Sequence, residues 1–130
     1  LWMPIWEAEE WMPVSRRSPE MMAFLMDEIS PSHMKKIAAF LDKNATPSHL
    51  DHLFWVPIPR DLLNETQFQH ENCRPHVFAL ELGPDWVKME FFVRSLSTMR
   101  CECQAYCTAQ QRDYVIRFAH EMIHHLRIRA

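Results

Sequence analysis

The stretch His76–Arg94 reads HVFALELGPDWVKMEFFVR and decides the fold predicted for this chain. In its second half apolar and polar residues alternate, which is the period-two pattern of a half-buried β-strand. The apolar positions of that half are Val87, Met89, Phe91 and Val93. The turn-forming trio Gly83-Pro84-Asp85 separates them from a first apolar run, His76–Leu82. The stretch therefore predicts an antiparallel hairpin with one buried face.

Further strands are predicted on both sides of this hairpin. Met99–Cys107 follows it and reads as a third strand. Leu53–Val56 is a short apolar run between prolines, which suits an edge strand. The polar segment Pro57–Pro75 lies between this run and the hairpin, and we predict a loop there with a helical turn near Asp61–Glu65.

Two helices are predicted before the strands. Ser18-Pro19 and Ser30-Pro31 each place a capping serine before a proline at the first helical position. Apolar residues at helical spacing follow each pair: Met22, Leu25, Met26 and Ile29 after the first, and Met34, Ile37, Ala38 and Leu41 after the second. Since Pro31 should end the first helix, the two helices are expected to meet at a bend.

A long helix is predicted at the C-terminal end, over Ala109–Ile128. It begins at Thr108-Ala109-Gln110-Gln111, which matches a capping box. Its apolar stripe consists of Val115, Phe118, Ala119, Met122 and Leu126. The predicted fold class is α+β, with two N-terminal helices, an antiparallel β-meander of three to four strands, and the long C-terminal helix packed on the sheet.

The 130 residues suffice for one domain with its own core. We predict a single α+β domain over residues 15–130, preceded by a Trp/Met/Pro-rich arm over residues 1–14. The arm carries Trp2, Trp6 and Trp11, which either cover the core as a lid or anchor a partner. These three tryptophans are the predicted partner-binding residues.

Composition excludes several function classes. A net charge of −3 argues against general binding to nucleic acid or to anionic membranes. No run approaches the ~18 apolar residues of a membrane-spanning helix. The single glycine, Gly83, excludes glycine-rich phosphate loops and the Gly-x-Ser-x-Gly nucleophile elbow. The four cysteines are expected to be free thiols in a cytoplasmic protein.

The segment His120-Glu121-Met122-Ile123-His124 is the motif that could name an enzyme class. On a helix, histidines at i and i+4 can share a zinc ion while the intervening glutamate acts as a general base. A catalytic zinc needs about three protein ligands, however, and few residues follow His124. The apolar stripe of the helix also turns His120 and His124 toward solvent. We therefore predict two surface histidines, with a zinc-dependent hydrolase or metal-binding site as the alternative.

The cysteines allow two interpretations. On a strand, Cys101, Cys103 and Cys107 would share one face, from which they could bind a metal together with Cys73 or a histidine. The simpler interpretation is that they are small apolar side chains packed under a helix, and no Cys-x-x-Cys pair is present. No metal ligand is therefore predicted.

Cys107 is a separate case because it directly precedes the capped helix. Partial positive charge at a helix N-terminus stabilises a thiolate, so thiol chemistry at Cys107 is a further alternative.

Taken together, the sequence predicts a small binding or interaction module without catalytic residues or cofactor. Its expected partner is a protein or a second copy of the chain, such as in a homodimer, and not nucleic acid or a membrane.

Overall fold

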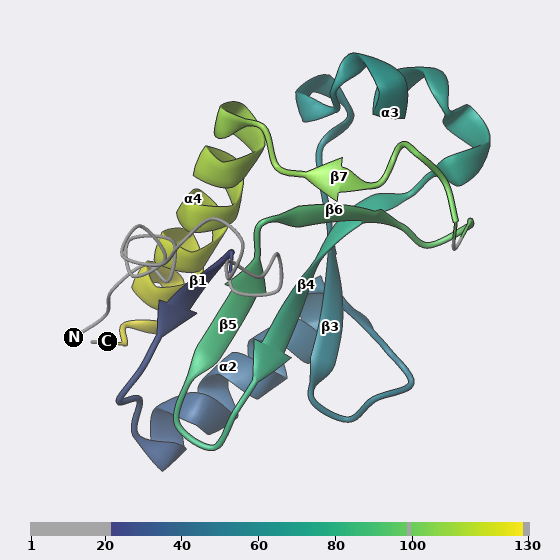
Figure 1. Cartoon of the computed structure of the whole chain (residues 1–130). Coiled ribbons are helices and arrows are strands. Elements are labelled where there is room, and N and C mark those ends of the chain that lie inside the picture. Colours follow the sequence, from purple (N-terminus) through teal and green to yellow (C-terminus); the bar gives the residue numbers. More distant parts are fainter. Residues whose placement is uncertain (1–21, 99, 129–130) are drawn as a thin grey trace, which may run out of the picture.

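The computed structural model describes residues 22–98 and 100–128, and its centre is an antiparallel sheet of seven strands (Figure 1). Along the sheet the order is β1-β5-β4-β3-β2, while β6 pairs with β4 and β7. The strands are β1 (Ala23–Met26), β2 (Thr46–Pro47), β3 (Leu53–Pro57), β4 (His76–Leu82), β5 (Val87–Glu90), β6 (Phe92–Ser95) and β7 (Ala105–Tyr106).

Two long helices cover one face of this sheet (Figure 1). They contact each other through Phe40 and Phe118, whose ring centroids lie 6.3 Å apart, and Phe118 also meets Phe78 of β4 at 5.8 Å. The long helices are α2 (Pro31–Asn44) and α4 (Ala109–Leu126); the shorter ones are α3 (Glu65–Gln69) and the 3-10 helices η3 (Arg60–Leu62) and η4 (Glu71–Cys73). The predicted α+β class is confirmed.

The predicted hairpin is confirmed, with a bend that the sequence pattern did not show. β4 and β5 pair with Leu80 opposite Met89, and the alternate apolar residues are buried through Val93. At Phe91 the second strand bends and divides into β5 and β6. The Phe91 N–H donates to the Met22 carbonyl, and the Phe91 carbonyl accepts from the Cys107 N–H. The same edge therefore carries β1 beside β5 and β7 beside β6.

The first predicted helix is wrong. Residues 23–26 form strand β1, which pairs antiparallel with β5, so among the described residues α2 is the one N-terminal helix and a strand precedes it. Phe24 and Met26 are buried with the half-buried Leu25 between them, a spacing that suits a strand as well as a helix. Pairing with the open edge of β5 decides between the two, because tertiary contacts override weak local preferences. Residues 18–21, with the predicted cap, lie outside the described residues.

The other differences concern strand lengths. The predicted strand Met99–Cys107 is reduced to β7, because the chain turns before it, where the Gln104 N–H donates to the Cys101 carbonyl. The run Leu53–Val56 is a strand as predicted, but β2 pairs with it, so it is second from the edge. The loop before the hairpin contains the predicted helical turn, as η3, and also α3 and η4.

Both long helices begin where their caps predict. The Ser30 side chain accepts a hydrogen bond from the His33 N–H, and Thr108 forms the capping box with Gln111. Val115, Ala119 and Met122 of α4 are buried against the sheet. No helix among the described residues has the length and apolar content needed to cross a membrane.

Candidate metal centre

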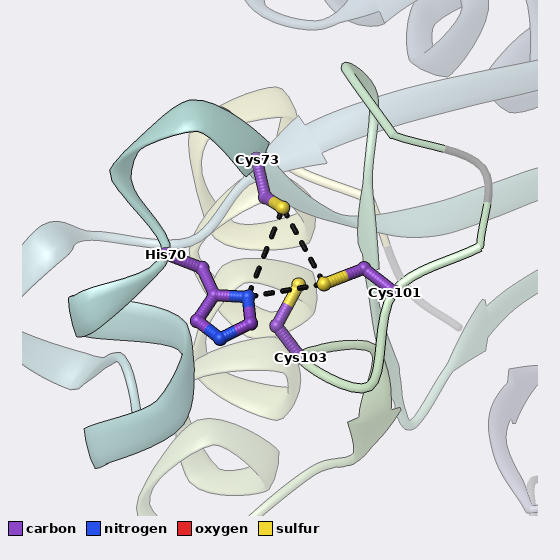
Figure 2. A group of neighbouring side chains, drawn as sticks. All are labelled: His70, Cys73, Cys101 and Cys103. Atoms are coloured by element: carbon purple, nitrogen blue, oxygen red, sulfur yellow. Dashed lines mark hydrogen bonds between the residues drawn. The ribbon is translucent and has the colours of Figure 1, made fainter.

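Four side chains converge beyond the end of the sheet where α3 lies above β6 and β7 (Figures 1 and 2). They are His70, Cys73, Cys101 and Cys103, whose donor atoms all lie within 4.8 Å of one another. Within the described parts of the chain, no other group of three or more His, Cys, Asp or Glu donors gathers in this way.

The distances in this cluster are close to those around one tetrahedral zinc ion. His70 Nδ1 lies 3.0 Å from Cys101 Sγ and 3.9 Å from Cys73 Sγ, and the Cys73 and Cys101 sulfurs are 3.5 Å apart. Zinc–sulfur and zinc–nitrogen bond lengths imply sulfur–sulfur separations of about 3.8 Å and sulfur–nitrogen separations of about 3.5 Å. Shifts of about half an ångström per atom would therefore suffice to receive the ion.

The first two donors come from the segment between β3 and β4. α3 begins with a capping box made by Asn64 and Gln67, and His70 directly follows its last residue. The chain then tightens into η4, where the Cys73 N–H donates to the His70 carbonyl at 3.0 Å. This turn brings the imidazole and the Cys73 thiol to the same side, which explains the spacing of two residues between them.

The other two donors come from the loop between β6 and β7. The turn closed by the Cys101 carbonyl places the thiols of Cys101 and Cys103 toward the first pair (Figure 2). The Ser95 N–H at the end of β6 donates to Gln104 Oε1 at 2.9 Å, and the Ser95 hydroxyl donates to the Cys73 carbonyl. Hydrogen bonds thus connect both ligand-bearing segments to the end of β6, and the register places His76 of β4 opposite Ser95.

A buried pair of amides supports the cluster from the side of α4. Gln67 Nε2 donates to the Cys103 carbonyl at 3.0 Å, and Gln111 Nε2 donates to Gln67 Oε1 at 2.8 Å. Gln67 Oε1 also accepts a hydrogen bond from the Asn64 N–H, and Gln111 Oε1 accepts one from the Thr108 N–H. Each glutamine therefore closes the capping box of its own helix and also bonds to a second segment. This bridge links the ligand loop to the first turn of α4.

The thiols of the cluster differ in acidity. The pKa of Cys73 is lowered to about 7, chiefly because the Thr98 hydroxyl, 3.6 Å away, can donate to the thiolate. Burial raises the pKa of Cys103 to about 12. A bound cation has to displace the Cys103 proton, as metals do when they bind thiol ligands.

Three thiolates and one imidazole form a soft donor set that suits Zn²⁺. With four protein ligands, a tetrahedral ion has no position left for water or substrate. Closed sites of this kind stabilise structure, whereas catalytic zinc keeps a position open.

The His120-Glu121 motif is not part of this cluster. All three of its polar residues, His120, Glu121 and His124, are exposed, so the orientation predicted for them is confirmed. The His120 ring lies edge-on to Phe24, with centroids 6.0 Å apart. In the part of the chain that the structure describes, no third donor joins the two histidines.

Cys107 also lies outside the cluster, and burial raises the pKa of its thiol to about 12. Desolvation has the largest effect on this thiol, and it does not favour Cys107 as a nucleophile. The predicted partner-binding residues Trp2, Trp6 and Trp11 lie outside the described residues.

The sequence pattern allows Cys101, Cys103 and Cys73 as metal partners but favours simple packing, and it does not single out His70. The prediction that Cys101, Cys103 and Cys107 share a strand face is wrong, because Cys101 and Cys103 lie in a turn. The signal that was available is His-x-x-Cys at 70–73 followed by Cys-x-Cys at 101–103. Neither half is the Cys-x-x-Cys pair that usually draws attention to zinc.

Comparisons with protein-family models, with curated proteins and with solved structures find no match to this chain.

Proposed function

We propose that this chain is a zinc-binding domain in which His70, Cys73, Cys101 and Cys103 hold one structural Zn²⁺. The observation that carries the proposal is the convergence of their four donor atoms within 4.8 Å, from segments on either side of the hairpin. The ion would join the segment containing α3 and η4 to the loop between β6 and β7.

The lack of apolar burial in these segments supports a structural role. Within residues 59–75, the only buried apolar side chain is Cys73, while Leu62 and Leu63 pack against the core only in part. In the described part of residues 96–106, the only one is Cys103. Segments with so few core contacts need another source of stability, and a metal bound by both can supply it.

Metal analysis of the untagged full chain tests this proposal. We expect roughly one zinc per chain, as a single tetrahedral site requires. Cys103→Ser should lose the metal, because it removes a buried thiolate ligand. Cys107→Ser is the matched control and should keep it, since Cys107 lies outside the cluster.

His124→Ala distinguishes this site from the His120-Glu121 motif. Zinc that persists in His124→Ala and disappears in Cys103→Ser supports the cluster. The opposite pattern, or a wild-type chain without stoichiometric metal under zinc-replete conditions, would overturn the proposal.

A second candidate, an interaction module that self-associates, is favoured by exposed apolar side chains near the site. Large apolar residues more than a third exposed are few among the described residues, and three of them lie on the segments that carry the ligands. They are Phe68, Leu96 and Tyr106. Since aromatic residues are enriched in interfaces, we propose this end of the domain as a contact surface between two copies of the chain.

Light scattering coupled to size-exclusion chromatography tests that second candidate. The zinc-loaded chain should elute as a dimer and a Phe68→Ser/Leu96→Ser variant as a monomer. A monomeric wild type at high protein concentration would contradict it.

A further inference from the structure

The four donors of the cluster differ in their access to solvent. Cys73 and Cys103 are buried, whereas Cys101 is partly exposed on the loop between β6 and β7. Zinc holds its sulfur ligands as thiolates, and thiolate character together with access determines which cysteines are oxidised. Cys101 is therefore the cluster cysteine most accessible to an oxidant from solvent.

Cys73 is placed to react with an oxidised Cys101. The two sulfurs are 3.5 Å apart, and a disulfide would require them to approach by about 1.5 Å. Cys101 and Cys103 are only two positions apart in one turn, where normal disulfide geometry is difficult to reach. Cys73 and Cys101 thus combine a short sulfur–sulfur distance with positions on two different segments.

Resting on the proposed zinc site, we propose that this site is a peroxide-sensitive switch. A peroxide converts the thiolates of Cys73 and Cys101 into a disulfide, and the zinc ion leaves because two of its four ligands are lost. The ligand set would then act both as a structural support and as a sensor of oxidants.

The reaction balances with hydrogen peroxide as the oxidant. The Cys101 thiolate attacks one peroxide oxygen, the O–O bond breaks, and the hydroxide that leaves takes up a proton to form water. The Cys73 thiolate then attacks the resulting sulfenic acid, so that the S–S bond forms and the S–O bond breaks. The second hydroxide also becomes water. Two thiolates, one peroxide and two protons thus give one disulfide and two waters.

The oxidised form would keep the two segments together. The disulfide would join Cys73 and Cys101, which are 28 positions apart. It would therefore connect the segment containing η4 to the loop between β6 and β7, as the zinc ion would. A cross-link over such a span restricts the unfolded chain and stabilises the fold. Oxidised zinc-free protein should therefore melt at a higher temperature than reduced zinc-free protein.

Titration of the zinc-loaded full chain with hydrogen peroxide tests the proposal. Zinc release is followed with a coloured chelator, and thiols are alkylated with one reagent before reduction and with a second reagent after it. We expect roughly one zinc released per peroxide consumed, with the second label on Cys73 and Cys101. Reductant and fresh zinc should restore the starting state.

Cys107→Ser is the matched control, and its zinc release should be unchanged. Retention of zinc at about tenfold excess of peroxide would overturn the inference, and so would a disulfide mapped to another pair of cysteines. A melting temperature of the oxidised protein no higher than that of the reduced zinc-free protein would also count against it. If the chain holds no zinc at all, the proposed function itself fails; zinc-loaded protein that ignores peroxide contradicts only the switch.

Discussion

Cys73 is unusual because its thiol is buried and yet has a lowered pKa. Of the two cluster thiols whose pKa is shifted, Cys73 and Cys103, it is the more acidic. The hydroxyl of Thr98 outweighs the desolvation that burial imposes, and the pKa of Cys73 falls to about 7. Cys103 lacks such a dominant donor and its pKa rises to about 12. The Thr98 hydroxyl beside Cys73 and the burial of Cys103 are thus the largest causes that separate the pKa values of two thiols in the same cluster.

This difference predicts the pH dependence of zinc affinity. Above about pH 7 the metal-free protein already holds Cys73 as a thiolate, so zinc displaces no proton from it. Below pH 7 that proton must be displaced, and affinity should fall by up to about tenfold more per pH unit than it does above. The slope of zinc affinity against pH should therefore change near pH 7, and we call this change the break. Competition with a chelator of known pH dependence, from pH 6 to pH 8, measures it.

Thr98→Val sharpens that test, because the valine cannot donate to the Cys73 thiolate. The pKa of Cys73 should rise in the variant, and the break in affinity should move to higher pH. A break that stays at the same pH would show that Thr98 does not control this thiol.

Single residues also show which parts of the candidate site can be predicted from the sequence. The outward orientation of His120 and His124 follows from helical spacing alone and is confirmed. The role of His70 could not be read in the same way, because its partner Cys101 lies 31 positions away, on the other side of the hairpin along the chain. Spacing identifies local ligand pairs but not the pairs that a sheet brings together.

At the scale of elements, two capping boxes are joined to each other. Gln67 closes the box of α3 and Gln111 that of α4, and the two buried side chains share a hydrogen bond of 2.8 Å. Residues that ordinarily stabilise one helix end here also fix two helices relative to the ligand loop. A change in either glutamine should therefore affect both the fold and the metal site.

We expect Gln111→Ala to lower the free energy of unfolding by about 1–3 kcal/mol, because it leaves buried partners of the bridge unsatisfied. Zinc affinity should fall as well, since Gln67 would lose its support next to Cys103. Urea unfolding and chelator competition measure the two effects.

Gln110→Ala is the control for this bridge, because Gln110 is exposed one position earlier on the same helix. Its effect should stay within about 0.5 kcal/mol. Equal losses in the two variants would contradict the assigned role of the amide bridge.

The elements divide into those that local rules determine and those that they do not. The starts of α2 and α4 follow from caps whose hydrogen bonds involve neighbouring residues, and sequence reasoning found both. Local rules predict a helix in place of β1, because its apolar spacing fits either structure and its partner strand lies more than 60 positions further along the chain. The turn at Cys101 similarly limits the strand predicted over Met99–Cys107 to β7.

At the scale of the whole molecule, the core and the metal centre are separate. The two long helices and the sheet contribute the large buried side chains, such as Ile37 of α2 and Phe78 and Leu80 of β4. The segments around the ligands bury few apolar side chains besides two of the ligands themselves. Loss of metal should therefore be felt locally and not throughout the fold.

Hydrogen exchange after zinc removal by a chelator measures this separation. We expect amide protection to fall in residues 60–75 and 96–107, while β4 and α4 remain protected, because their stability comes from the apolar core. The zinc-free protein should melt at a lower temperature than the zinc-loaded protein. Below that temperature it should keep most of its helical circular dichroism signal. Uniform loss of protection across the chain would instead show that the metal supports the entire domain.

The pairing of His76 with Ser95 has a further consequence, since the hairpin lies between the two ligand pairs along the chain. A strand that slips by one residue reverses its side chains, and a slip of two displaces it by about 7 Å. Neither misalignment would leave the donors close enough to coordinate one ion. Zinc binding would thus select chains whose hairpin is correctly paired. A newly synthesised chain could bind its zinc ion only after residue 103 has been translated and the strands are aligned. Mispaired chains would remain susceptible to proteolysis.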